Sequence, residues 1–456
     1  MVTPLELSAG DTAWVLTSAA LVLMMTVPGL ALFYGGMTRA KSVLNMMMMS
    51  FSALAVVGVL WVLFGYSMTF GDSAGGLGLV GNPLEALGLT GLMSESAMSG
   101  SIPTLAFVSF QAAFAIIAVA LISGAVADRM KFGAWILFAI VWVTVVYFPV
   151  AHWVFAFDGD TTKGGWIANT IEALDFAGGT AIHINAGAAA LALVLVLGKR
   201  LGFAKEPMRP HNLPLVMIGS ALLFVGWFGF NAGSALGANT LAAVAFINTI
   251  AATAAAVIGW LVLEKLRDGH ATSLGAASGV IAGLVGITPA ANSVSPLGAL
   301  AIGLVCGAIA AWAVGLKYKF GYDDSLDVVG VHMVAGLVGT LLIGLLADPA
   351  SPAGVAGLLY GGGLEQLGRQ SVGAFAVMIF SFVVTFVIAK ILDATMGLRV
   401  SADEEAQGID THTHAESAYD LNPFGGRLGK GALAPAPAVA TETTTPESLT
   451  PEESAK

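Results

Sequence analysis

The chain has 456 residues, of which 57% are hydrophobic and 11% charged, and its mean hydropathy is +0.84. A soluble domain carries about 25% charged residues, so this composition excludes a soluble globular protein and indicates a polytopic membrane protein. The net charge of −10 says little about partners because much of the acid lies in the C-terminal tail, but the absence of a basic patch argues against nucleic acid. With a single cysteine, Cys306, the chain cannot form an intrachain disulfide.

Length and hydropathy predict an all-α membrane protein with eleven transmembrane helices. Backbone N–H and C=O groups in lipid must be hydrogen-bonded within the protein, and apolar segments of this length satisfy them as helices. The predicted spans cover about 13–36, 43–70, 103–126, 133–155, 177–197, 213–231, 240–263, 273–288, 296–316, 328–347 and 370–393. The eighth span is short for a helix that crosses the bilayer.

Lysine and arginine are distributed unevenly between the predicted loops. The loops after the first, third, fifth, seventh and ninth spans contain Arg39, Lys41, Arg129, Lys131, Lys199, Arg200, Lys205, Arg209, Lys265, Arg267, Lys317 and Lys319. The opposite loops contain Lys163 and Arg369. Because positively charged loops stay in the cytoplasm, the N-terminus is predicted outside and the C-terminus in the cytoplasm.

Composition changes after the last span. Residues 1–395 are predicted to form the transmembrane domain, and residues 396–427 a polar tail packed on its cytoplasmic face. Residues 428–456 are rich in Pro, Ala, Thr and Glu, which predicts a disordered C-terminal tail. The first dozen residues contain no Lys or Arg, so no secretory signal is predicted.

Two spans contain a single histidine and are preceded by an acid. Asp175 precedes a run that contains His183, and Asp327 precedes a run that contains His332. In both runs the histidine is followed by the pattern x-x-Ala-Gly. Ionisable groups inside a span are rare and by default indicate a transport pathway or a relay; the alternative is a packing histidine bonded to a neighbouring helix.

The similarity of these two runs suggests an internal repeat. If spans 1–5 and 6–10 are copies of one unit, each copy has an odd number of spans, so the two copies insert in opposite orientations. The eleventh span is then a single final helix. His183 would then lie roughly 12 Å from Asp175, and His332 about 7.5 Å from Asp327, measured along each helix. Both histidines would approach the middle of the bilayer, where inverted-repeat transporters place their sites.

Five separated motifs together resemble the ammonium transporter (Amt/Mep/Rh) family, and its bacterial Amt branch most closely. They are DFAGGTAIHINAGAAAL (175–191), GWFGFNAGSALGAN (226–239), ITPAANSVSP (287–296), DVVGVHMVAG (327–336) and GLRVSADEEAQGID (397–410). The resemblance extends over roughly residues 12–420. It implies a homotrimer in the cytoplasmic membrane that takes up nitrogen as ammonium, with a pore through each protomer.

The same resemblance implies roles for residues in and around the histidine runs. His183 and His332 resemble the paired histidines of the pore. Asp175 resembles an acid near the outer recruitment site, which shapes that site and is a candidate for deprotonating the cargo.

Further roles follow from motifs on other spans. Phe114 and Phe230 resemble two stacked phenylalanines that form a gate. Ser234 resembles the hydroxyl that receives ammonium at the outer mouth, and Trp227 an aromatic residue of the pore lining.

One position departs from the family pattern. The family commonly has His-x-Val-Trp at the end of the fourth span, where the Trp forms one wall of a cation cage. This chain has Phe155 at that position, which offers a weaker π face than Trp. Trp153 is offset by two residues and should point elsewhere.

The chemistry of ammonium suggests how such a pore selects it. A cation–π wall contributes about 0.5–2 kcal/mol, whereas a charge in the middle of the bilayer costs at least about 2.5–3.5 kcal/mol. Ammonium can lose a proton and cross as neutral ammonia, which potassium cannot do. Two neutral, mutually hydrogen-bonded imidazoles would offer weak polar contacts on the way.

Other function classes stay open at this point. The chain could be an ammonium sensor that signals through a PII-type protein at the cytoplasmic face, or a proton- or metal-coupled carrier that uses the histidines as ligands. No nucleophile–base pair or phosphate-binding loop occurs in a motif context, so an enzyme is not predicted. No cofactor or resident metal is predicted, and the other expected partner is the lipid bilayer.

Overall fold

The structure is a computed structural model that describes residues 6–419, and the part up to Ala418 forms one compact unit of packed helices. Residues 420–456 lie outside the described residues, and with them the predicted disordered tail and the end of the predicted segment 396–427. The predicted domain boundaries therefore stay predictions.

Ten helical segments among the described residues are long and apolar enough to cross a membrane. They are Ala9–Met37, Val43–Phe70, Thr104–Val126, Phe132–Phe155, Gly179–Leu197, Leu213–Ala235, Thr240–Asp268, Pro296–Phe320, Val329–Leu346 and Glu365–Met396. A shorter apolar helix of 15 residues, Ser273–Ile287, occupies the position of the predicted eighth span. The all-helical membrane fold is confirmed, and ten of the eleven predicted spans correspond to helices of membrane-crossing length.

Several spans in the first half of the chain are α-helices interrupted by a π-helical turn. The elements are α1 (Ala9–Met24), a π turn (Met25–Leu30), α2 (Ala31–Met37), α3 (Val43–Leu60), a π turn (Trp61–Gly65), α4 (Tyr66–Phe70), α5 (Thr104–Ile122), a 3-10 turn (Ser123–Val126), α6 (Phe132–Trp142), a π turn (Val143–Tyr147), α7 (Phe148–Phe155), a π turn (Gly179–Ile184) and α8 (Asn185–Leu197). Between α4 and α5 lie two short 3-10 turns (Ala74–Gly76 and Leu87–Leu89) and the antiparallel pair β1 (Met98–Ser99) and β2 (Ile102–Pro103), and a further π turn (Ile167–Ile171) precedes α8.

The second half of the chain contains longer uninterrupted helices. The elements are α9 (Leu213–Asn231), a 3-10 turn (Gly233–Ala235), α10 (Thr240–Asp268), α11 (Ser273–Ile287), α12 (Pro296–Ala313), α13 (Leu316–Phe320), a π turn (Val329–Val334), α14 (Ala335–Leu346), a 3-10 turn (Leu358–Tyr360), α15 (Glu365–Met396), α16 (Ala402–Gln407) and a π turn (Asp410–His414).

Four consecutive helices of this half, α9 to α12, begin at a polar residue that caps the first turn. The side chains of Asn212, Asn239, Thr272 and Ser295 each accept a hydrogen bond from the backbone N–H three residues later. Such caps satisfy backbone donors that have no partner within the helix, so these short polar residues determine where each apolar segment starts.

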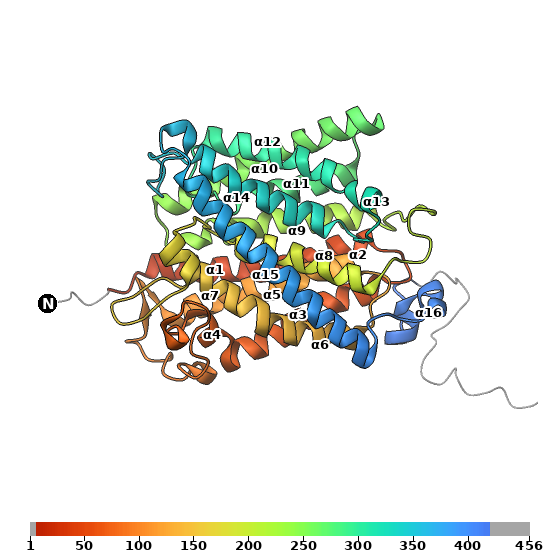
Figure 1. Ribbon diagram of the computed structural model, residues 1–456, viewed down its shortest axis with the longest axis horizontal. Coiled ribbons are helices and arrows are strands. Elements are labelled where there is room, and N and C mark those ends of the chain that lie inside the picture. Colours follow the sequence, from red (N-terminus) through yellow and green to blue (C-terminus); the bar gives the residue numbers. More distant parts are fainter. Residues whose placement is uncertain (1–5, 420–456) are drawn as a thin grey trace, which may run out of the picture. The chain divides into compact units, whose positions relative to one another are not determined.

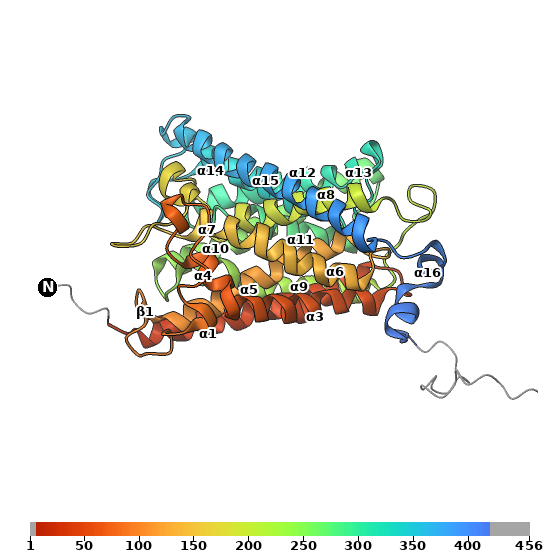
Figure 2. The same cartoon turned by 60° about the horizontal axis from the view of Figure 1, so that its bottom comes forward.

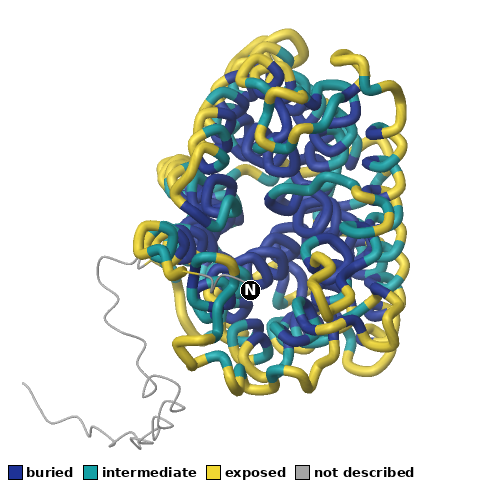
Figure 3. The backbone as a smooth tube through the Cα atoms, turned by 90° about the vertical axis from the view of Figure 1, so that its left-hand side faces the viewer, coloured by how far each residue is buried: buried dark blue, intermediate teal, exposed yellow. Residues whose placement is uncertain are grey.

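The helices of the two halves pack side by side within the compact unit. In Figure 1 the spans of the first half, α3 and α6 among them, lie below α10 and α12 of the second half, and α15 runs obliquely across both. Figure 2 shows α15 passing over α8, against which it packs. The buried residues lie inside the bundle and the exposed ones around it (Figure 3).

Glycines allow each histidine-containing π turn to pack closely on the helix that follows the other one, α8 on Val329–Val334 and α14 on Gly179–Ile184. A Cβ atom added at Gly187 would lie 2.6 Å from the backbone nitrogen of Met333, and one at Gly336 would lie 3.2 Å from the Cβ of His183. Each of these glycines is the last residue of the His-x-x-Ala-Gly pattern. The repeated pattern therefore has a structural reason, because it brings the backbones of the two histidine helices together.

Residues after α15 pack against one end of the bundle, which we call the tail end. The buried Glu405 side chain accepts hydrogen bonds from the Leu201 N–H at 2.7 Å and from Arg399 at 2.7 Å. Asp410 accepts from the N–H groups of Leu44 and Asn45 at the start of α3, at 3.0 and 2.8 Å. The segment up to the last π turn is thus part of the packed unit.

Candidate functional site

The two histidines found in the sequence lie side by side in the interior. The Nδ1 atoms of His183 and His332 are 3.2 Å apart, and both side chains are buried. A hydrogen bond between two Nδ1 atoms needs one ring as the donor and the other as the acceptor, so the accepting ring has its proton on Nε2. The Nε2 atom of His183 is buried and has no hydrogen-bond partner. This free edge distinguishes the pair from packing histidines bonded to a neighbouring helix.

Both histidines sit on a π-helical turn that continues as an α-helix. His183 belongs to Gly179–Ile184, which leads into α8, and His332 to Val329–Val334, which leads into α14. A π turn adds one residue to the helical turn and is frequent at functional sites, although several other spans of this chain also contain one. Neither turn was visible in the hydrophobic pattern.

Asp175 caps the turn that contains His183. Its Oδ1 accepts from the N–H groups of Gly178 and Gly179 at 2.9 and 2.6 Å, and its Oδ2 from those of Thr180 and Ala181 at 2.8 and 3.0 Å. All four are donors that a helix start leaves without a partner. With two hydrogen bonds on each oxygen, this carboxylate fixes the position of the helix start.

In the second half the corresponding acid is Asp324 rather than the predicted Asp327. Asp324 is buried and accepts from the Val329 N–H at 2.7 Å, at the start of the turn that contains His332. Asp327 instead has a positive φ of 65° and pairs with Lys317 at 2.6 Å. Asp175 and Asp324 each lie eight residues before their histidine, a spacing that could have identified the pair in the sequence.

A column of rings leads from the surface of the bundle to the histidine pair. Phe114 stacks on Phe230, with ring centroids 4.3 Å apart and an interplanar angle of 18°. Phe230 lies 6.0 Å from the ring of His183, and His183 lies 5.3 Å from His332. The stacked phenylalanines that the family resemblance implied are therefore present, and they are followed directly by the histidines.

Trp227 supports this column from the side. Its ring stacks on His183 with centroids 5.4 Å apart and an interplanar angle of 16°. Its indole N–H donates to the hydroxyl of Thr288 at 2.9 Å, and that hydroxyl lies 3.2 Å from the side-chain oxygen of Asn231. This polar chain holds the indole plane parallel to the imidazole; the sequence did not point to Thr288.

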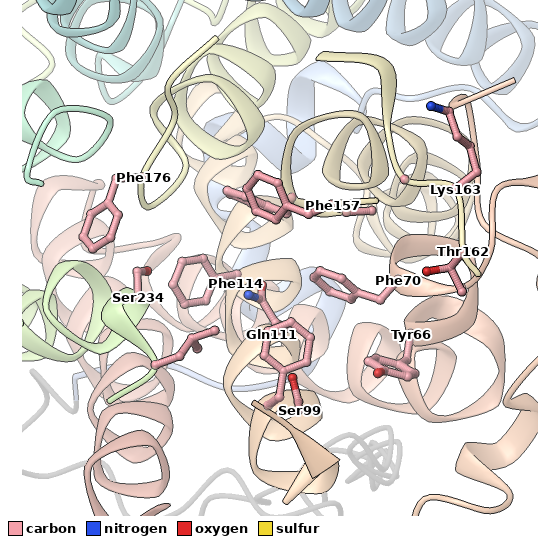
Figure 4. A pocket seen from close by; sticks show the side chains of 16 residues that line it. Tyr66, Phe70, Ser99, Gln111, Phe114, Phe157, Thr162, Lys163, Phe176 and Ser234 are labelled. Carbon is pink, nitrogen blue, oxygen red and sulfur yellow. The ribbon is translucent and has the colours of Figure 1, made fainter. Parts of the chain in front are cut away.

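A pocket of about 360 Å³ adjoins the outer ring of the column, Phe114. Residues of α4 and α7 line it, and in Figure 1 these helices lie at the opposite end of the bundle from α16. We call this the pocket end. Its lining consists of Tyr66, Phe70, Gly71, Ser99, Phe107, Gln111, Phe114, Phe155, Ala156, Phe157, Thr162, Lys163, Gly164, Phe176, Ser234 and Leu236. Figure 4 shows Ser234 and Phe114 close together on one side of the pocket. The Ser234 hydroxyl donates to the carbonyl of Phe230 at 2.8 Å, which leaves its oxygen able to accept a hydrogen bond from a ligand.

The structure brings Phe155 into the pocket and keeps Trp153 out of it. Phe155 is among the lining residues, whereas the indole of Trp153 donates to the Leu79 carbonyl at 2.7 Å and packs on Phe380 at 4.7 Å. The offset of two residues was thus a sound basis for expecting Trp153 to point elsewhere.

Sequence reasoning missed part of the pocket. Phe107 and Gln111 line it together with Phe114, and the three lie at i, i+4 and i+7 on one face of α5. Tyr66 and Phe70, four residues apart, line it from α4. Helical spacing from Phe114 could have identified the first two, but nothing local pointed to α4.

Membrane-length helices packed around a buried histidine pair, with a pocket and a column of rings leading to it, define a polytopic membrane transport protein. Residues 13–419 match the model of the Ammonium Transporter Family. The chain is 60% identical over 434 residues to an ammonium transporter of Mycobacterium tuberculosis, covering 90% of each chain. The chain belongs to the ammonium transporter family.

Solved structures agree with this assignment. The structure of Candida albicans Mep2 superposes with a TM-score of 0.79 at 33% identity, covering 88% of each chain. A protein described as a sensor Amt protein superposes with a TM-score of 0.81 at 26% identity, covering 89% of this chain and 98% of its own. The Mycobacterium tuberculosis relative is named an ammonium transporter, and transport is the function that the family description gives.

Proposed function

We propose that this protein captures ammonium in the pocket, removes one proton from it, and conducts ammonia between the rings and past the histidine pair. The observation that carries the proposal is the contact of the Nδ1 atoms of His183 and His332, 3.2 Å apart, at the inner end of the ring column. Packing alone gives no reason for two buried histidines to face one another with an unpaired Nε2 beside them.

Capture takes place where the pocket meets the column. Phe114 and Phe155 offer π faces, the Ser234 oxygen accepts an N–H of the ion, and Asp175 fixes the backbone behind them. These contacts are worth about 0.5–2 kcal/mol for each aromatic face, which is enough to collect a cation from water but not to take it into an apolar column.

Transfer of a proton from ammonium to water in the open pocket then makes passage possible. The stacked rings of Phe114 and Phe230 exclude a hydrated ion, and a fixed charge at this depth costs at least about 2.5–3.5 kcal/mol. Ammonia is neutral and avoids this cost, whereas potassium has no proton to lose and keeps its charge. Beyond the rings, the imidazoles of His183 and His332 offer ammonia a hydrogen bond without a deep binding well, while Trp227 holds the first imidazole in place.

We also propose the topology and assembly that the sequence suggested. Eleven helices cross the cytoplasmic membrane with the pocket end outside and the tail end inside, as two inverted five-helix repeats and a final helix. The matching positions of Asp175 and Asp324, each capping a π turn that contains a histidine, support the repeat. We propose a homotrimer with a pore in each protomer.

The test uses liposomes that contain only this protein. Methylammonium uptake and potassium influx are measured for the wild type, for the double variant His183→Ala/His332→Ala, and for His183→Asp and His332→Asp. We expect the double variant to differ from the wild type in methylammonium uptake or potassium influx. The Asp variants should admit potassium, because a carboxylate in the column stabilises a cation there. The matched control is His270→Ala, an exposed loop histidine. Unchanged uptake and selectivity in all three variants would remove the histidine pair from the mechanism.

A second candidate function is sensing, and the similarity to the sensor Amt protein favours it. In that case the output would pass from the tail end to a cytoplasmic PII-type protein. A sensor keeps its response when flux is lost, so the same liposomes separate the two: absence of any ammonium-driven flux in the wild type would favour sensing.

A further inference from the structure

The pocket is much larger than the ion it is proposed to capture. Its volume is about 360 Å³, whereas a water-sized molecule such as ammonium occupies about 30 Å³. Capture next to Phe114 and Ser234 uses only a small part of this space. Figure 4 shows the two sides of the pocket, with Phe176, Ser234 and Phe114 on one side and Tyr66, Phe70 and Thr162 on the other.

We define the far lobe of the pocket by Tyr66, Phe70 and Phe107. The rings of Phe70 and Phe107 meet edge to face with centroids 4.8 Å apart, and Tyr66 lies 5.7 Å from Phe70. Residues on two separate helices, α4 and α5, thus bring three aromatic side chains to one part of the pocket wall. All three are only partly buried, so the pocket reaches their rings.

The far lobe has the chemistry that a small ammonium ion needs. Aromatic rings attract a cation, and the rings of Tyr66, Phe70 and Phe107 are partly exposed at the pocket wall. Oxygen acceptors for the N–H groups of the ion come from Tyr66, Ser99 and Gln111, which also line the pocket. No carboxylate lines the pocket among the described residues, so an ion bound here is held weakly and can move on.

Charge on the pocket lip is balanced. Lys163 is the charged side chain among the described lining residues, and its ammonium group pairs with Asp158 at 3.0 Å. The neighbouring carboxylate offsets part of the repulsion that Lys163 would exert on an incoming cation.

We infer that the far lobe is a second binding site for small primary ammonium ions, occupied before the ion reaches Phe114 and Ser234. The site would raise the local concentration of ammonium at the top of the column. It also offers a physical reason why the chain can have Phe155 where the family has a Trp, because part of the π contact with the cation is made at Tyr66, Phe70 and Phe107. This inference rests on the proposed function, since it concerns the same pocket and cargo.

The test is the concentration dependence of radiolabelled methylammonium uptake into liposomes containing the full chain. Removing a ring with Phe70→Leu or Phe107→Leu should raise the half-saturating concentration about two- to fivefold for each ring, the equivalent of one exposed cation–π contact. The loss should be largest at low substrate and shrink towards saturation. Phe70→Tyr keeps a ring and should recover most of the loss, and Phe107→Trp should lower the half-saturating concentration.

The matched control is Phe64→Leu. Phe64 lies two residues before Tyr66 and packs on Phe148 with ring centroids 6.2 Å apart, but it does not line the pocket. An equal shift in this control, or unchanged half-saturation in both Leu variants, would overturn the second site. Wild-type liposomes without any uptake would instead overturn the proposed function, so the two failures are distinguishable. If a Leu variant does not fold, the Phe107→Trp result decides, because no fall in its half-saturating concentration would also count against the site.

Discussion

Replacement of Asp175 by Asn tests whether this carboxylate acts by fixing the helix that contains His183. The carboxylate accepts four backbone N–H groups, two on each oxygen, at 2.6–3.0 Å. An Asn side chain has one oxygen, so it can keep two of the four bonds and directs its NH₂ group at the other two donors. Hydrogen bonds to a charged acceptor contribute about 1.5–3 kcal/mol each, which gives a loss of about 3–6 kcal/mol for Asp175→Asn.

The assay has two readouts on the same purified protein, its thermal melting temperature and its methylammonium uptake in liposomes. Because total stabilities are about 5–15 kcal/mol, a loss of this size should lower the melting temperature clearly and impair uptake. The control is Glu172→Gln, three residues away, whose carboxylate forms an exposed pair with Arg369. Such a pair is worth about 0–1 kcal/mol, so the control should melt near the wild type.

The two readouts also separate positioning from chemistry. An Asp175→Asn protein that melts at the wild-type temperature but takes up no substrate would show that the carboxylate acts on the cargo rather than on the backbone. Wild-type melting together with wild-type uptake would refute both the calculation and the role of Asp175.

Two further predictions concern the aromatic residues. Phe155→Trp should strengthen capture and lower the half-saturating methylammonium concentration about two- to fivefold, because Trp offers the strongest cation–π face; an unchanged concentration dependence would place the wall elsewhere. Thr288→Val removes the acceptor of the Trp227 indole and leaves a buried donor unpaired, at a cost of about 1–3 kcal/mol. We expect a lower melting temperature and reduced uptake, whereas Thr288→Ser should keep the bond and both properties.

The membrane spans could be predicted from sequence because hydropathy acts over whole helices. The predicted fifth span, 177–197, differs by two residues from the observed Gly179–Leu197 at its start, and the seventh extends to Asp268 rather than 263. The extension is a polar helix end, with Glu264 and Lys265 inside α10, which a hydropathy criterion cuts off. The positions of the helix ends depend on caps and charges that such a criterion does not include.

The candidate site was predictable where a side chain is unusual in its surroundings. His183 and His332 are recognisable because a bilayer penalises ionisable groups, and the structure places them together. Thr288 and Phe70 are ordinary residues for a membrane helix, and their relevance depends on which neighbours they meet in three dimensions. Asp327 was preferred to Asp324 because it lies closer to the apolar run, whereas the hydrogen bonds depend on backbone direction.

The cap of α3 is supplied from the other end of the chain. Asp410 lies after the last membrane-length helix. Its carboxylate nevertheless accepts hydrogen bonds from the N–H groups of Leu44 and Asn45, which lie 366 and 365 residues earlier in the chain. During synthesis the second span must therefore enter the membrane long before its cap exists. This end of the bundle can reach its final form only after the last span has been made. A chain that stops before Asp410 therefore leaves the N–H groups at the start of α3 without this acceptor.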